Sequence, residues 1–275
     1  MIITFIADKM LDRFPNFASA LLSISRRENA FVRIIEGTKD IWIRDYMPII
    51  LPSGKMIQFK YEPSYLTQGY DHLITETGIL EKQFGFPTKK SKLNMDGGNY
   101  VRIENTVMIC DRILSENPSV SPHEVLTRLK FMLEAEKIIL LPTHPYDPVG
   151  HADGIVAVSD NNKVIIEQLK EKASPIEIAY YYQLKTTLQK ANLHVVECPL
   201  DLPDEGYINI WDNRGSYLNF SFIGNTILIP VYQNTDKNKL LEFFIPQFPK
   251  RKIWMINCEE IEKEGGAIHC VTWTA

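Results

Sequence analysis

Alternating apolar and polar positions recur in four segments of the chain, and a short polar turn interrupts each segment. The turns carry Ser53-Gly54, Glu104-Asn105, Asn161-Asn162 and Gly224-Asn225, residue types that tolerate the positive φ of tight hairpins. Alternation on both sides of such a turn predicts a β-hairpin. The four predicted hairpins span residues 48–61, 99–112, 154–169 and 217–232.

Helix-like stretches lie between and around these hairpins. They span residues 17–27, 70–84, 121–136, 175–191 and 237–248. The third has Ser121 as a predicted N-cap and Pro122 at its first helical position. Short apolar strands at 137–141, 194–197 and 252–257 follow the last three. The repeated unit is therefore a hairpin, a helix and a strand.

The units open near Asp45, Asp96, His151, Ser216 and Cys270, which are about 51, 55, 65 and 54 residues apart. A regular period predicts a closed or stacked α/β assembly, although an ordinary α/β sheet with uneven hairpins would leave a similar trace. No Pro/Gly/Ser-rich linker divides the chain, so we expect residues 1–275 to form a single catalytic domain.

Composition narrows the classes of function. The 275 residues are 45% hydrophobic with a formal net charge of -4, so the chain lacks the basic excess that nucleic-acid binding needs. The first apolar run, residues 2–7, is too short for a signal peptide, and no stretch approaches a membrane span. We expect a cytoplasmic protein without nucleic-acid or membrane partners. A homo-oligomer is compatible with the sequence.

The four cysteines are widely scattered and lack the paired spacing of zinc or redox motifs. Cys110 and Cys198 are predicted to be small buried hydrophobes, because each lies beside an apolar strand. No metal site and no organic cofactor is expected.

The segments that open the units carry most of the chemistry. They read WIRDYMP at 42–48, DGGN at 96–99, GHADG at 150–154, SYLNF at 216–220 and GGAIHCVT at 265–272. Taken singly, each has an ordinary interpretation, such as a surface ion pair, a sharp turn or a bend before a strand. If the units surround a pseudo-axis, however, the five segments converge and gather a thiol, an imidazole, three carboxylates and a carboxamide.

In this order and spacing, the motifs resemble those of the agmatine deiminase and bacterial peptidylarginine deiminase family, from Trp42 to Thr272. The resemblance implies the pentein fold, a five-bladed α/β propeller of ββαβ-type modules around a central active site. The chain departs from the family pattern in Met47, where glycine is usual, and in Asp96, where glutamate is common. It also lacks the insertions that commonly surround the substrate.

The resemblance implies a metal-free hydrolysis of a guanidinium group through Cys270. Its thiolate would attack the guanidinium carbon, while Asp45 and Asp153 grip the guanidinium nitrogens. His151 would protonate the departing ammonia and then activate water, with Asp96 orienting the imidazole.

Two more residues complete the site that the resemblance implies. Asn219 matches a substrate-binding amide of the peptidylarginine relatives, and Trp42 is expected to wall the site. His269 is adjacent to Cys270 on a predicted strand, so we expect its side chain to point away from the thiol and to have a structural role.

The substrate best matched is agmatine, giving N-carbamoylputrescine and ammonia as in polyamine biosynthesis. Alternatives are deimination of peptidyl-arginine, free arginine or methylarginine, amidino transfer, and guanidinium binding without turnover. Free arginine would need a cation for its α-carboxylate, for which Arg214 is a candidate, although an exposed loop arginine is the simpler interpretation. Agmatine would prefer an acidic or aromatic environment for its tail. Candidates for that environment are Asp204, Glu205, Tyr207 and Trp211.

Overall fold

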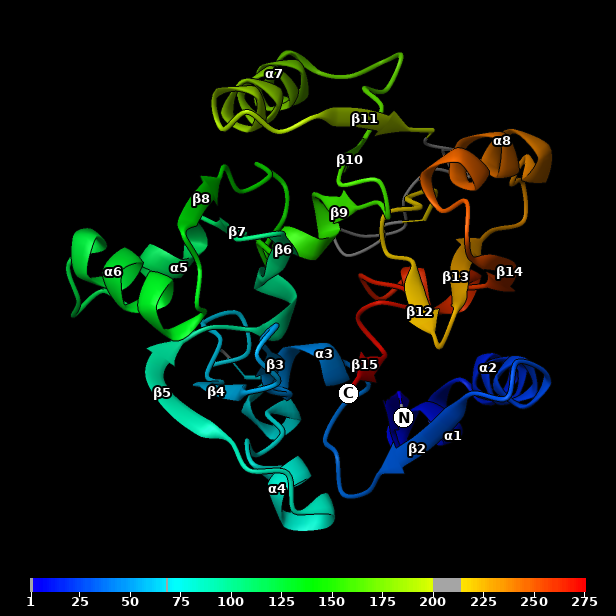
Figure 1. The fold of residues 1–275 in the computed structure, drawn as a ribbon, viewed down its shortest axis with the longest axis horizontal. Coiled ribbons are helices and arrows are strands. Elements are labelled where there is room, and N and C mark those ends of the chain that lie inside the picture. Colours follow the sequence, from blue (N-terminus) through cyan, green and yellow to red (C-terminus); the bar gives the residue numbers. More distant parts are fainter. Residues whose placement is uncertain (1, 68, 200–213) are drawn as a thin grey trace.

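The computed structural model describes residues 2–67, 69–199 and 214–275. Within these ranges, the strands form five three-stranded sheets arranged as blades around a centre (Figure 1). In four of these sheets the middle strand pairs antiparallel with the strand before it and parallel with the strand that follows the helix. In the fifth sheet the last strand of the chain takes the antiparallel position beside the first strand, which is the middle strand of that sheet. The predicted order of hairpin, helix and strand is confirmed, and the α/β propeller with it.

The first two modules follow directly in the chain. The first contains β3 (Ile49–Ile50), β4 (Met56–Lys60), η1 (Asp71–Leu73), α4 (Ile79–Phe84) and β5 (Lys89–Asn94). The second contains β6 (Val101–Ile103), β7 (Thr106–Cys110), α5 (Arg112–Ser115), α6 (Pro122–Met132) and β8 (Lys137–Leu141).

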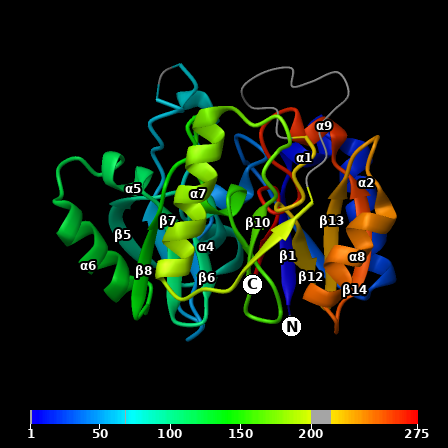
Figure 2. The same cartoon turned by 90° about the horizontal axis from the view of Figure 1, so that it is seen from above.

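The next two modules carry the longer outer helices. The third contains β9 (Ala157–Val158), β10 (Val164–Glu167), α7 (Pro175–Lys190) and β11 (Val195–Cys198). The fourth contains β12 (Ser221–Ile223), β13 (Thr226–Val231), α8 (Lys237–Gln247) and β14 (Lys252–Asn257). Helices α6, α7 and α8 lie on the outside of the ring (Figures 1 and 2).

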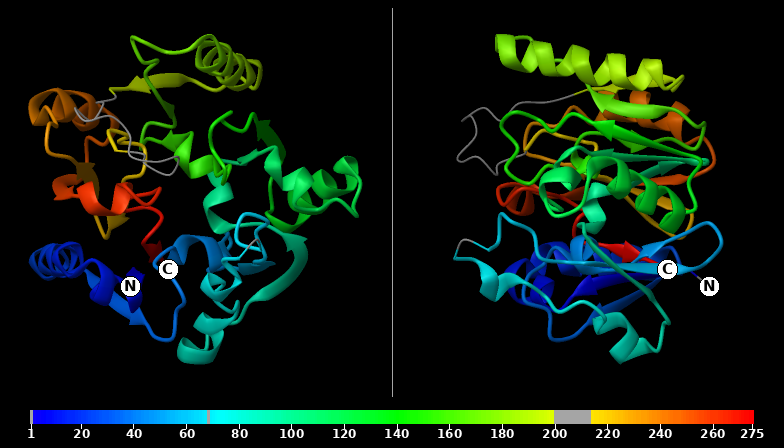
Figure 3. Two further views of the ribbon diagram at one scale, coloured as in Figure 1. Left: turned by 180° about the vertical axis from the view of Figure 1, so that it is seen from behind. Right: turned by 90° about the vertical axis from the view of Figure 1, so that its left-hand side faces the viewer.

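The fifth module joins the two ends of the chain. It contains β15 (Trp273–Thr274), β1 (Ile3–Ala7), α1 (Lys9–Arg13), α2 (Pro15–Arg27) and β2 (Phe31–Ile35). Strand β15 pairs antiparallel with β1, with Trp273 opposite Phe5, so the termini lie side by side (Figure 3). The apolar run at residues 2–7 is thus the central strand of the sheet that closes the ring.

Short helical turns lie at the inner ends of the modules. They are α3 (Ile43–Tyr46), η2 (Gly97–Asn99) and η3 (Ala152–Gly154), while α9 (Glu259–Glu262) precedes the last opening segment. Turn α3 contacts η2, and η2 contacts η3. The first three opening segments therefore meet, as the period predicted.

Apolar side chains fill the interfaces between neighbouring modules. One buried cluster joins Ile57 of the first module to Leu129 of the second, and another joins Met108 of the second to Leu188 of the third. A third cluster packs fourth-module residues against the third and fifth modules, and a fourth joins the fifth module to the first. Because every interface is apolar, the buried polar groups of the opening segments collect at the centre.

Features predicted from a few neighbouring residues, such as hairpin turns and a helix N-cap, agree with the structure. The hairpin turns place Gly54, Glu104, Asn162 and Gly224 at positive φ. Ser121 caps α6 by accepting a hydrogen bond from the Glu124 amide, as predicted. Cys110 and Cys198 are fully buried among apolar side chains, which confirms the structural interpretation of both.

The helix predicted at residues 70–84 is wrong for its first half. Only η1 and α4 are helical there, and Gly78 between them lies at a φ of 87°. Thr75 is buried and its hydroxyl accepts a hydrogen bond from the Lys39 amide, so this stretch is held by a distant loop instead of by its own helix. No helix within the described ranges is long and apolar enough to cross a membrane.

Candidate active site

Cys270 lies in a turn directly before β15, and Asn219 holds that turn. The Asn219 Oδ1 atom accepts hydrogen bonds from the amides of Ala267 (2.9 Å) and Cys270 (3.2 Å), and its Nδ2 atom donates to the Cys270 Sγ atom at 3.1 Å. These three side-chain bonds of Asn219 go to the thiol and its turn. A direct contact of Asn219 with substrate stays a prediction.

Asp45 is brought to the same centre by the short helix α3. The Arg44 amide donates to the Cys270 carbonyl (3.1 Å), and the Arg44 Nε atom donates to the His269 carbonyl (3.4 Å). Both contacts fasten α3 to the cysteine turn. Asp45 is therefore placed relative to Cys270 by the backbone of its own neighbour.

His151 is buried between two carboxylates. Its Nε2 atom is 2.7 Å from Asp96 Oδ2, and its Nδ1 atom is 3.5 Å from Asp45 Oδ1. Asp96 thus reaches the imidazole in spite of the shorter side chain that distinguishes it from the family glutamate. Burial alone would lower the pKa of His151, but Asp45 and Asp96 outweigh it and raise that pKa to about 10, so the imidazole is cationic.

Asp153 faces the thiol from η3. Its Oδ2 atom lies 3.9 Å from Cys270 Sγ and 3.6 Å from His269 Nε2. The expectation that His269 points away from Cys270 is wrong, because the segment is a turn and both side chains reach the same carboxylate oxygen. Burial lowers the pKa of His269 well below its usual value, and the nearby Arg44 adds to the effect, so this second imidazole is neutral.

Burial also governs the charge of the acids. It raises the pKa of Asp45 to about 8 and that of Asp153 to about 6, with His151 acting in the opposite direction on both. Burial and the two carboxylates raise the pKa of the Cys270 thiol well above its usual value, and the Asn219 hydrogen bond acts in the opposite direction. In the free protein the nucleophile is thus a neutral thiol.

Glycines allow the opening segments to approach one another closely. A Cβ atom on Gly98 would lie 2.6 Å from His151 Nδ1 and 2.7 Å from Asp45 Oδ1. A Cβ atom on Gly266 would lie 3.0 Å from both Cys270 Sγ and the ring of Trp42. Packing around the reacting groups thus excludes a Cβ atom at Gly98 and leaves little room for one at Gly266, and Trp42 lies beside the cysteine turn.

Three further expectations concern Arg214, the residues proposed for the substrate tail, and the presence of a metal site. Arg214 is only 1% exposed and forms an ion pair with Glu259 at 2.8 Å, so its interpretation as an exposed loop residue is wrong. The tail candidates Asp204, Glu205, Tyr207 and Trp211 lie outside the described residues. Within the described ranges, no three His, Cys, Asp or Glu side chains are arranged to hold a metal ion.

Known proteins resemble this chain over most of its length. Residues 9–275 match the family model described as Porphyromonas-type peptidyl-arginine deiminase. A Streptococcus mutans protein named "Putative agmatine deiminase" is 24% identical over 294 aligned residues, which cover 93% of this chain and 79% of that protein.

Solved structures extend the likeness to the fold. The agmatine deiminase of C. jejuni superposes with a TM-score of 0.77 at 18% identity, covering 100% of this chain and 96% of that one. DDAH from Pseudomonas aeruginosa superposes with a TM-score of 0.58 at 11% identity, covering 99% and 98%. The fold is the pentein fold.

Proposed function

Because the chain belongs to the Porphyromonas-type peptidyl-arginine deiminase family, we propose that it is a guanidine deiminase whose substrate is agmatine. The observation that carries the proposal is the convergence of Cys270, His151, Asp45 and Asp153 within one buried centre. A guanidinium ion is a poor electrophile, so its hydrolysis needs a strong nucleophile, fixed geometry and a proton donor for the leaving amine.

The reaction begins with a change of charge. The guanidinium enters between Asp45 and Asp153, which form hydrogen bonds to its nitrogens, and its positive charge favours ionisation of the nearby thiol. The thiol proton leaves to solvent as the cation binds. Cys270 Sγ then forms a bond to the guanidinium carbon.

The imidazole completes the first half of the reaction. His151 gives a proton to the departing nitrogen, the C–N bond breaks, and ammonia leaves a covalent thiouronium on Cys270. Neutral His151 next takes a proton from water, whose oxygen bonds to the same carbon. The adduct then loses its hydroxyl proton to solvent, and cleavage of the C–S bond releases the neutral ureido product and restores the thiolate.

The choice of agmatine follows from the tail of the substrate. Free arginine carries an α-carboxylate, which needs a cation when it is buried. Arg214, the candidate for that task, forms an ion pair with Glu259, and Arg44 in the site donates to the His269 carbonyl. Asp45 and Asp153 flank Arg44 and further satisfy its charge. Agmatine lacks the carboxylate and therefore needs no cation at its tail.

One set of assays tests both levels of the proposal. Purified protein is incubated with agmatine, arginine, a methylarginine and an arginyl peptide, and the ureido product and ammonia are measured for each. We expect the highest kcat/KM for agmatine, and we expect no ureido product from any substrate with Cys270→Ser. If arginine or the peptide is better by tenfold or more, the agmatine assignment is wrong and the deiminase chemistry stands. If no substrate gives a ureido product, the deiminase proposal fails.

Amidino transfer shares the covalent intermediate and is separated by its products. If the protein transferred the amidino group, adding a primary amine to the agmatine reaction would yield a new guanidine in place of ammonia and N-carbamoylputrescine. We expect the yield of N-carbamoylputrescine to be unchanged by the amine.

A further inference from the structure

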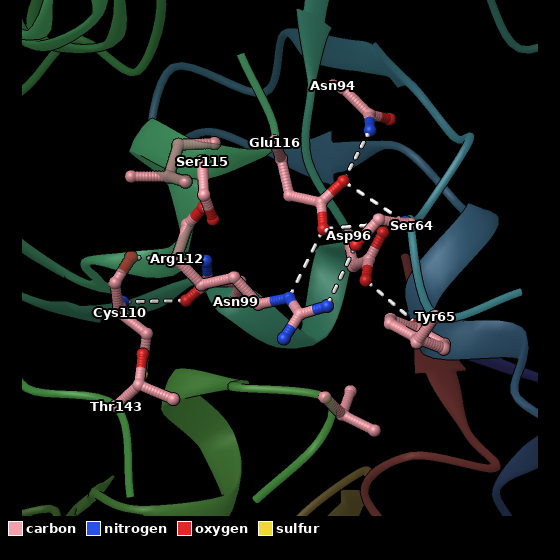
Figure 4. Close-up of polar contacts among 12 residues, drawn as sticks. Ser64, Tyr65, Asn94, Asp96, Asn99, Cys110, Arg112, Ser115, Glu116 and Thr143 are labelled. Atoms are coloured by element: carbon pink, nitrogen blue, oxygen red, sulfur yellow. Dashed lines mark hydrogen bonds and ion pairs between the residues drawn. The ribbon is translucent and has the colours of Figure 1, made fainter. Parts of the chain in front are cut away.

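A tyrosine outside every recognised motif touches the catalytic pair from behind. Tyr65 lies in the segment at residues 62–67, which follows β4 (Figure 4). Its hydroxyl donates to Asp96 Oδ2 at 2.9 Å, and the Nε2 atom of His151 meets the same oxygen at 2.7 Å. The Tyr65 ring lies edge-on to the imidazole, with 6.2 Å between the ring centres. One carboxylate oxygen is therefore shared by a phenol and the imidazole.

Tyr65 can act only as a donor to that oxygen. Burial raises its pKa well above the usual value, and the charge of Asp96 acts in the same direction. A neutral hydroxyl that donates to a carboxylate draws charge from the oxygen, which weakens the attraction of that oxygen for a second proton. The hydroxyl thus competes with His151 for Asp96.

The segment that carries Tyr65 is fixed by one acidic side chain. Glu116 accepts hydrogen bonds from the Ser64 amide (3.1 Å), the Ser64 hydroxyl (2.6 Å) and Asn94 Nδ2 (3.0 Å), and Arg112 Nε lies 3.2 Å away (Figure 4). Its side chain is only 12% exposed. A carboxylate so fully engaged acts as an anchor for the segment.

Arg112 connects this anchor to both sides of the catalytic pair. Its guanidinium lies over the Tyr65 ring at 5.6 Å and donates to the Ser64 hydroxyl at 2.9 Å. Its Cδ atom lies 2.9 Å from where a Cβ of Gly150 would be, and Gly150 precedes His151. The same arginine thus supports the ring that reaches Asp96 and the backbone that leads to the imidazole.

We propose that Tyr65 is a positioning residue for the deiminase reaction: it holds Asp96 against His151 and limits how tightly Asp96 retains the imidazole proton, while Glu116 and Arg112 fix Tyr65 in place. This inference rests on the proposed function for its kinetic consequence. His151 must give up a proton to ammonia and later take one from water, so a carboxylate that binds the proton too strongly would slow the first transfer. The charged groups that face His151 are Asp45, Asp96 and Asp153, and none of them is altered in the test.

The test removes only the hydroxyl. In Tyr65→Phe we expect kcat to fall about tenfold and KM to stay within about twofold, because Asp45 and Asp153 still grip the guanidinium. We also expect the His151 imidazole to titrate at higher pH, as followed by NMR of the imidazole nitrogens. Tyr70→Phe is the matched control, since Tyr70 is 54% exposed in the same loop. It should change neither quantity.

A second variant tests the anchor. Glu116→Gln keeps the shape of the side chain but removes the charge that faces Arg112. We therefore expect kcat to decrease and the pH at which His151 titrates to rise, with both changes smaller than in Tyr65→Phe. In the double variant Tyr65→Phe/Glu116→Gln, kcat should fall no further than in Tyr65→Phe, because Glu116 acts through the tyrosine. Additive losses in kcat would overturn that relation.

The two readouts separate this inference from the proposed function. If the wild-type protein deiminates no guanidine, but Tyr65→Phe still moves the His151 titration, the positioning role stands and the deiminase proposal fails. If agmatine is turned over and Tyr65→Phe changes neither kcat nor the titration, the positioning role is wrong. A rise in KM with kcat unchanged would also overturn it, since Tyr65 would then be a substrate contact. Melting temperatures within a few degrees of wild type confirm that the variants are folded.

Discussion

The substitution Gly98→Ala tests whether the site depends on the close approach of its opening segments. The new Cβ atom would lie 2.6 Å from His151 Nδ1 and 2.7 Å from Asp45 Oδ1, whereas ordinary van der Waals contact begins at 3.4 Å. The contact with His151 must therefore open by about 0.8 Å and the contact with Asp45 by about 0.7 Å. Neither can move freely, because Asp96 holds the other ring nitrogen of His151 at 2.7 Å and the Gly98 amide itself donates to Asp45 at 3.2 Å.

Displacements of about 1 Å in reacting groups commonly cost about 100-fold in rate, so we expect kcat/KM for agmatine to fall by about that factor. Overpacking should cost about 1–3 kcal/mol of stability, measured by urea unfolding. Gly154→Ala is the matched control. Gly154 is exposed, its φ lies outside the left-handed region, and its Cβ would meet no atom within 4 Å. If Gly98→Ala retained kcat/KM within about threefold of wild type while Gly154→Ala did the same, the proposed convergence at Gly98 would be refuted.

The remaining predictions concern the reacting groups. Cys270→Ser should abolish turnover while agmatine still binds, as measured by calorimetry; appreciable activity would remove Cys270 from the mechanism. Asp45→Asn and Asp153→Asn should each lower kcat more than they weaken binding, and wild-type rates in either would contradict the guanidinium clamp. Asn219→Ala should slow alkylation of Cys270 by iodoacetamide near neutral pH, because the amide favours the thiolate; an unchanged rate would exclude that role. In Cys270→Ser, agmatine binding at pH 7 should release a proton, and the affinity should increase as the pH rises from 6 to 8. The reason is that burial raises the pKa of Asp45 in the free protein to about 8, and a bound cation lowers that pKa. Proton uptake on binding, measured by calorimetry in two buffers, would contradict this sign.

The parts of the fold that could be predicted are those with a local cause. A hairpin turn such as Asn161-Asn162 needs only its own residues and the strands beside it, so the repeat and its period were legible. The pairing of β1 with β15 joins residues about 270 apart, and nothing in either short segment specifies the other. Local helical propensity also failed at residues 70–78, where the Thr75 hydroxyl is used by a loop from another module.

The candidate site shows the same division. Its charged groups stand in recognisable motifs, and these motifs predicted which side chains would meet. The residues that support them gave no comparable signal: Tyr65 follows an unremarkable Pro-Ser pair, and the need for glycine at position 98 arises from atoms that lie 53 residues before it in the chain and others that follow it by a similar distance. His269 was misplaced because a strand was assumed where a turn lies.

The charge balance of the centre accounts for the kind of substrate that it can accept. Three carboxylates, one cationic imidazole, the partly buried Arg44 and a thiol share a region from which water is largely removed. Burial raises the pKa of Asp45 to about 8 and raises the pKa of Cys270 well above its usual value, so both groups are mostly protonated in the free protein near neutral pH, whereas Asp153, with a pKa of about 6, is mostly ionised. A bound cation favours ionisation of both Asp45 and the thiol, and it places its own electrophilic carbon beside the sulfur that it has helped to ionise. A neutral urea would bring no such charge, so the product is bound less tightly than the substrate and the thiol returns to its protonated form as the product leaves.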